Sequence, residues 1–188
     1  MKVKLKGRPS IGIFGLAGVA FFGVCWLIAA SGDPGWEFGV QMISTLGVSG
    51  LDSESIFNIG CICSGMLVLI SGIGMTTVKK KAYFATSILV AIAGIGLTMI
   101  GLFPEDTGSI HSLIALILFS ALLIGMIVGT IGDFMYKKPL FGIITILLLI
   151  IIVISALTQS FAFLEGVAAI AGVTWLALHS VKLSLMKF

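Results

Sequence analysis

The sequence predicts an all-helical membrane protein built as one bundle of transmembrane helices. Of its 188 residues, 59% are hydrophobic and 10% are charged, whereas about a quarter of the residues in a soluble domain carry charge. The mean hydropathy of the chain is +1.22. Apolar runs long enough to cross a bilayer recur along the sequence, and basic residues occupy every second connection between them. These observations place residues 1–188 in a single transmembrane domain.

Six runs meet the requirement of about 20 apolar residues for one helical crossing. They occupy residues 11–30, 56–78, 82–102, 110–134, 140–158 and 162–181. The first run follows a basic segment, as in a secretory signal, but its length is that of a span, so we expect an uncleaved first helix. Pro104 ends the third helix, and Pro139 opens the fifth, where a first helical turn tolerates proline.

The alternation of basic residues predicts the orientation of the helices. The basic residues are Lys2, Lys4, Lys6, Arg8, Lys79, Lys80, Lys81, Lys137, Lys138, Lys182 and Lys187. Because short connections rich in lysine and arginine stay in the cytoplasm, both termini are expected there, in a multi-pass protein of the cell membrane. The opposite face carries Asp33, Glu37, Asp52, Glu54, Glu105, Asp106 and Glu165. Asp133 lies on the cytoplasmic side, and we expect it to pair with Lys137 one turn later.

Small residues three or four positions apart predict where helices pack closely. They occur in four spans, as Gly12, Gly15 and Gly18, as Gly60 and Ser64, as Gly125 and Gly129, and as Gly166, Ala169 and Gly172. The fifth span is almost continuous isoleucine, leucine and valine from Ile143 to Ile154, which suits a lipid-facing helix or a subunit interface. The expected partners are membrane lipids, with a membrane protein or a second copy docking through helix five or the glycine stripes. No basic patch suggests a nucleic acid.

The candidate catalytic residues are Glu105 and Asp106, in the turn before the fourth span, and His111, in the first turn of that helix. An imidazole beside carboxylates can perform general acid/base chemistry or help to hold a divalent cation. The alternative is that the two carboxylates solvate a turn while His111 lies at the interface. One histidine with two acids does not make a metal shell, so we predict no metal or cofactor. The sequence specifies no nucleophile, and it leaves open whether the protein is an enzyme.

The first outer connection, residues 31–55, is the longest and mixes apolar with polar side chains. We expect it to form a lid over an outer pocket or a passive helix at the membrane surface. Trp36 would anchor it at headgroup level, and Gln41 and Ser44 are candidate ligand-binding residues.

Asn58 stands one turn inside the second span, where a buried amide needs hydrogen-bond partners. It is a candidate ligand-binding residue that could reach Ser44 or His111, and an ordinary interhelical hydrogen bond is the alternative. His179 lies near the inner end of the sixth span, where we expect it to meet a lipid phosphate or a carbonyl group.

Several of these residues stand in short motifs: Ser44-Thr45-Leu46-Gly47, Phe57-Asn58-Ile59-Gly60, and Gly101-Leu102-Phe103-Pro104 followed by His111. In this order and between these spans, they resemble the prokaryotic membrane family called domain of unknown function 998. The resemblance implies a six-helix membrane fold without an established activity. It also implies that the polar groups belong to the outer half of one bundle.

The expected function is that of a binding protein for a lipid or small amphiphile, or of an accessory subunit, with a polar site at the extracytoplasmic face. The alternative is a membrane-embedded enzyme that acts on a lipid headgroup at the same face. A channel or transporter ranks last, because no span carries a carboxylate, lysine or histidine at its middle, where ion pathways place such groups.

Overall fold

The computed structural model describes residues 9–185, which contain six helices long and apolar enough to cross a membrane. They are α1 (Pro9–Gly32), α2 (Glu54–Met75), α3 (Lys81–Leu102), α4 (Ser109–Met135), α5 (Pro139–Thr158) and α6 (Phe161–Ser184). Two short 3-10 turns, η1 (Ile43–Gly47) and η2 (Glu105–Thr107), lie in the connections. No β-strand occurs in the described range. The prediction of an all-helical protein with six helices of membrane-spanning length and hydropathy is confirmed.

Local sequence explains where several helices begin and end. Pro139 is the first residue of α5, where its missing N–H interrupts no helical hydrogen bond. Ser160 caps α6, because its hydroxyl oxygen accepts a hydrogen bond from the Phe163 N–H at 3.1 Å. The shortest helix, α5, has 20 residues, and at 1.5 Å per residue it is about 30 Å long, the thickness of a bilayer core.

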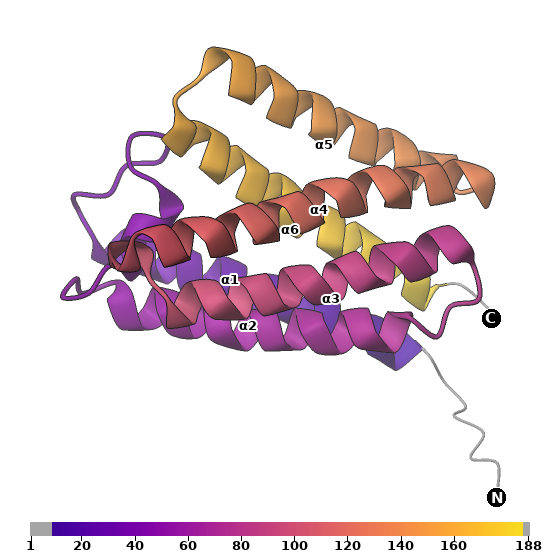
Figure 1. Cartoon of the computed structure of the whole chain (residues 1–188), viewed down its shortest axis with the longest axis horizontal. Coiled ribbons are helices and arrows are strands. Elements are labelled where there is room, and N and C mark those ends of the chain that lie inside the picture. Colours follow the sequence, from indigo (N-terminus) through magenta and orange to yellow (C-terminus); the bar gives the residue numbers. More distant parts are fainter. Residues whose placement is uncertain (1–8, 186–188) are drawn as a thin grey trace, which may run out of the picture.

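The six helices of the described range form a ring in which each packs against the next in the sequence. The contact between α1 and α6 closes the ring. The α1–α2, α2–α3 and α3–α4 pairs pack most extensively, whereas α5 packs less extensively on α4 and α6 and lies along the outside of the bundle (Figure 1). Most of the α5 side chains therefore face outward, and whether lipid or another subunit covers them stays a prediction.

The two ends of the bundle carry opposite charge. The start of α1, the end of α6 and the α2–α3 and α4–α5 turns lie at one end (Figure 1). We call this the basic end, because its turns contain Lys79, Lys80, Lys81, Lys137 and Lys138. The other end, which we call the acidic end, contains the remaining connections, with Asp33, Glu37, Asp52, Glu54, Glu105 and Asp106.

Glycines allow α2 and α3 to approach backbone to backbone. A Cβ atom at Gly65 would collide with the backbone of Thr98, and one at Gly94 would collide with the backbone of Leu69. The α1 stripe plays the same part against α6, since a Cβ atom at Gly15 would collide with the Ser180 hydroxyl. Small residues in these stripes therefore set the helix spacing.

A buried ion pair joins helices at the basic end. Lys182 of α6 pairs with Asp133 of α4, and their side chains are 2% and 1% exposed. The Tyr83 hydroxyl of α3 donates a second hydrogen bond to Asp133, at 2.7 Å. The predicted pairing of Asp133 with Lys137 is wrong: α4 ends at Met135, and Lys137 is exposed, with a φ of 59°. The helical spacing that would have aligned the two side chains is therefore lost.

His179 belongs to the packed interior at this end, so the prediction that it meets a lipid phosphate or a carbonyl group is wrong. Its side chain is 1% exposed. The ring stacks on Trp175, with 5.4 Å between the ring centroids. Neither ring nitrogen has a hydrogen-bond partner among residues 9–185. His179 therefore serves as a core aromatic residue.

Candidate functional site

A cavity that reaches the acidic end lies between α4 and α6, and the first connection, η2 and α5 also contribute lining residues. Its volume is about 500 Å³, within the range of about 300–1,000 Å³ that small-molecule sites occupy. We call it the α4–α6 groove. Its polar lining consists of Ser44, Glu105, His111, Ser112 and Glu165. Its apolar lining consists of Met42, Ala115, Leu116, Phe119, Leu122, Leu123, Met126, Ile152, Phe161, Leu164 and Ala168.

The groove is polar at one end and apolar along its length. On α4 the lining runs from His111 to Met126, a rise of about 22 Å at 1.5 Å per residue. Leu116 and Phe161 lie on its rim and are 64% and 73% exposed. Because these lining side chains are exposed, the groove opens at the surface of the bundle.

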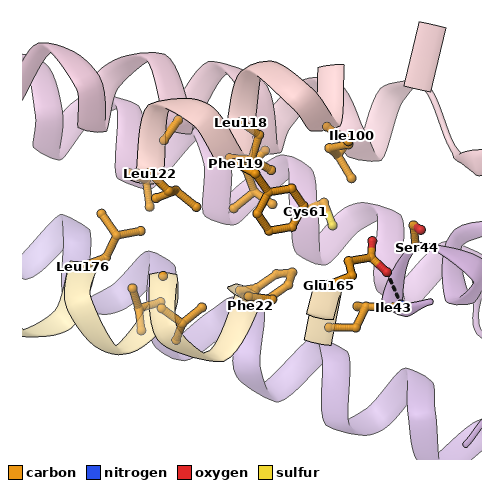
Figure 2. Close-up of a pocket in the computed structure, with 18 of the residues that line it drawn as sticks. Phe22, Ile43, Ser44, Cys61, Ile100, Leu118, Phe119, Leu122, Glu165 and Leu176 are labelled. Carbon is orange, nitrogen blue, oxygen red and sulfur yellow. Dashed lines mark hydrogen bonds between the residues drawn. The ribbon is translucent and has the colours of Figure 1, made fainter. Parts of the chain in front are cut away.

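A smaller cavity of about 80 Å³ in the centre of the ring shares several walls with the groove. Ser44, His111 and Glu165 line both cavities. Figure 2 shows the Glu165 carboxylate reaching toward η1, whereas Phe22 and Leu176 form an apolar wall. The polar groups therefore lie at the point where the two cavities meet.

Glu165 links α6 to the η1 turn of the first connection. Its Oε2 atom accepts a hydrogen bond from the Ile43 N–H at 2.8 Å, drawn as a dashed line in Figure 2. The Ser44 side chain is a second hydrogen-bonding partner of its carboxyl group. From the sequence, Glu165 is expected on the acidic face, but it is not among the predicted site residues. A carboxylate one turn inside an apolar helix is itself a functional signal, and that signal could have identified it.

His111 is oriented by the end of the preceding helix. Gly108 reverses the chain with a φ of 67°, and α4 then begins at Ser109. The ring Nδ1 lies 2.8 Å from the Phe103 carbonyl oxygen. A carbonyl oxygen only accepts, so Nδ1 carries the hydrogen, and Nε2 of the neutral ring is left as an acceptor. His111 is 6% exposed and is presented to the cavities by one fixed contact.

The two carboxylates of η2 differ in position. Glu105 lines the groove, and its Oε2 atom is buried without a hydrogen-bond partner among the described residues. Asp106 is exposed and lines neither cavity. Of the three candidate catalytic residues, the structure thus brings Glu105 and His111 to the groove and leaves Asp106 in solvent.

The side-chain amide of Asn58 binds the backbone of the first connection. Its Nδ2 atom donates to the Gly47 carbonyl oxygen at 2.9 Å, and its Oδ1 atom is buried without a partner in the described range. It lines neither cavity, so the structure does not bring it to Ser44 or His111 at the groove. Its role here is to fix the end of η1 on α2.

Gln41 and Trp36 also stabilise the first connection from within. The Gln41 amide accepts from the Glu37 N–H at 2.6 Å and donates to the Gly35 carbonyl oxygen at 3.1 Å. The Trp36 indole N–H donates to the Met42 carbonyl oxygen at 2.9 Å. Neither side chain lines the groove. Both instead hold the backbone of the connection that contributes Met42 and Ser44 to the lining.

The first connection is packed onto the bundle and contains no surface helix. Most residues of its η1 turn are buried against the helices at the acidic end. Phe38 stacks edge-on against Phe163 of α6, with 5.7 Å between the ring centroids. The Ser160 hydroxyl donates to the Gly39 carbonyl oxygen at 3.0 Å. The connection therefore covers α6 at the acidic end and forms part of the polar end of the groove.

The polar end offers hydrogen-bond acceptors and negative charge. No lysine or arginine is among the residues that line the groove. Within the part of the chain that the structure describes, no group of His, Cys, Asp or Glu side chains is arranged to hold a metal ion. The arrangement can bind a donor-rich or cationic group, and His111 can accept a proton there.

The model of the family described as Protein of unknown function (DUF998) matches residues 16–182. This match covers both cavities and confirms the resemblance that the short motifs predicted. No curated protein and no solved structure matches the chain.

Proposed function

The chain belongs to the DUF998 family of proteins of unknown function, and from its own geometry we propose that it binds a lipid or another small amphiphile of the membrane in a binding or accessory role. The observation that carries the proposal is the α4–α6 groove, where one cavity joins a polar end to a long apolar wall. An amphiphile has the same two parts in the same order. Polar groups that fix orientation within a mostly apolar site are the usual design of a small-molecule pocket.

We also propose that the polar end of the groove lies at the extracytoplasmic face of the cell membrane. The support is the charge separation of the bundle, because turns rich in lysine stay in the cytoplasm. The basic end contains Lys79–Lys81, Lys137 and Lys138, whereas Glu105 and Glu165 lie toward the acidic end. The headgroup of a bound amphiphile would then sit at the outer water interface.

A photoactivatable hexadecanol tests the proposal on the full-length protein in lipid nanodiscs. We expect the probe to label residues of α4 and α6 that line the groove. Ala115→Trp on α4 and Ala168→Trp on α6 each fill the groove from one wall, and each should reduce labelling about tenfold, the equivalent of about 1.4 kcal/mol. The matched control is Ala20→Trp, because Ala20 is exposed on α1 and lines neither cavity.

Undiminished labelling in both groove variants, with their elution as intact protein in size-exclusion chromatography, would refute the binding site. The same samples distinguish the enzymatic alternative, which the anchored imidazole of His111 favours. Binding without chemistry returns every lipid of the nanodisc unchanged in mass. A product that forms with the wild type and not with His111→Ala would instead assign a membrane-embedded enzyme.

A further inference from the structure

We propose that the headgroup bound in the α4–α6 groove is a protonated amine. This inference rests on the proposed function and names the chemistry of its ligand. The basis is a set of hydrogen-bond acceptor positions at the polar end that have no donor among the described residues.

Glu105 has a buried acceptor without a donor. Its Oε2 atom is shielded from solvent and has no hydrogen-bond partner among residues 9–185. Native proteins seldom leave a buried polar atom unpaired, so this atom, in a residue that lines the groove, indicates a missing hydrogen-bond partner. A carboxylate can accept hydrogen bonds only, so the missing group is a donor.

His111 adds a second acceptor at the same end. Its Nδ1–H is committed to the Phe103 carbonyl oxygen at 2.8 Å, which leaves Nε2 of the neutral ring with a lone pair. Glu165 adds a third, because the Ile43 N–H and the Ser44 side chain leave acceptor positions free on its carboxyl group. Three side chains from η2, α4 and α6 thus present acceptors to one cavity.

An ammonium group is the complement of this set. It carries three donors, no acceptor and a positive charge, whereas a hydroxyl group offers a single donor and no charge. A phosphate or carboxylate headgroup would bring acceptors and negative charge to Glu105 and Glu165, with no lysine or arginine in the lining to offset them. The groove therefore favours an amine over an alcohol and an alcohol over an acid.

Competition against the photoactivatable hexadecanol tests this order with probes of one chain length. Hexadecylamine, hexadecanol and hexadecanoic acid are each titrated into nanodiscs with the full chain. At neutral pH the amine is protonated, because a primary alkylamine titrates near a pKa of about 10. We expect hexadecylamine to compete at about tenfold lower concentration than hexadecanol, and hexadecanoic acid to be the weakest.

Charge-neutral variants show whether the two carboxylates cause the preference. Glu105→Gln and Glu165→Gln keep the shape of the side chain, and glutamine at 165 can still accept from the Ile43 N–H. Each should lower the preference for hexadecylamine over hexadecanol about tenfold, because the charge is lost while an acceptor oxygen remains. Asp52→Asn is the matched control, since Asp52 is an exposed carboxylate of the acidic end that lines neither cavity.

The outcomes separate this inference from the proposed function. Equal competition by all three probes, with labelling still blocked by Ala115→Trp, would overturn the amine preference and leave the groove as the binding site. Stronger binding of hexadecanoic acid, or an equal effect of Asp52→Asn, would also overturn it. If butylamine competed as well as hexadecylamine, the ligand would be a small amine without a long apolar chain. The proposal that the groove binds an amphiphile would then be wrong.

Discussion

His111 and Glu165 are both held by backbone groups of distant or neighbouring segments. The His111 ring contacts the Phe103 carbonyl oxygen, and the Glu165 carboxylate contacts the Ile43 N–H, each at 2.8 Å. The His111 anchor leaves Nε2 for a ligand, and the Ile43 and Ser44 contacts leave acceptor positions free on Glu165. Backbone anchors of this kind fix a side chain without neutralising it, which suits a binding site.

The sequence predicted half of this arrangement. Glu105 and His111 lie close together in the chain, so their proximity could be expected from one turn between two helices. Glu165 contacts Ile43 across a separation of 122 residues. That contact depends on how α6 closes the ring against α1, which the pattern of apolar residues in a single helix does not determine.

Asp133 gives a prediction for stability at the basic end. Asp133→Asn removes the charge that Lys182 pairs with, and it leaves a buried ammonium without a counter-ion. Breaking one side of a buried pair costs about 3–5 kcal/mol, and we expect a loss of unfolding free energy in that range. Unfolding of the detergent-solubilised protein by denaturant measures it.

The control for this prediction is Lys137→Met, because Lys137 was the partner that the sequence suggested and is exposed. It should change the unfolding free energy by less than about 0.5 kcal/mol. The double variant Asp133→Leu with Lys182→Met should recover much of the loss, since apolar residues can replace a buried pair. A Lys137→Met variant as unstable as Asp133→Asn would contradict the structural assignment.

At the scale of elements, α4 connects the polar end of the groove to its apolar wall. His111, Ala115, Leu122 and Met126 recur at spacings that place them on one helix face. The face begins with an imidazole and continues with apolar side chains toward the basic end. The sequence of α4 therefore indicates which end of this face is polar and which is apolar. It does not show that α5 and α6 leave space beside α4.

The first connection shows where element prediction from sequence stops. Its mixed composition suggested a lid or a surface helix, and the structure contains the η1 turn packed against α2 and α6. Trp36 and Gln41 bond to backbone atoms inside the connection. Such irregular structure depends on individual hydrogen bonds, which the periodicity of apolar residues does not predict.

At the scale of the whole molecule, the opposite charges of the two ends predict its orientation in the membrane. Ser49→Cys places an accessible thiol at the acidic end, and Lys79→Cys places one at the basic end, both at exposed positions. A membrane-impermeant maleimide added to intact cells should modify the first variant and spare the second. Lysed cells, in which both thiols should react, provide the control.

The reverse labelling pattern would invert the orientation. The groove would then open with its polar end toward the cytoplasm. The amphiphile site itself would remain, because it depends on the shape of the cavity and on its lining residues.

The central claim is that an amphiphile occupies the α4–α6 groove, and a density map of the full-length protein in lipid tests it most directly. The map needs enough resolution to show acyl chains and the side chains of α4. We predict an elongated density that begins beside Glu105 and Glu165 and follows α4 past Leu122 toward Met126. A groove that is empty or closed by its own side chains, with ordered lipid bound only elsewhere on the bundle, would contradict the account.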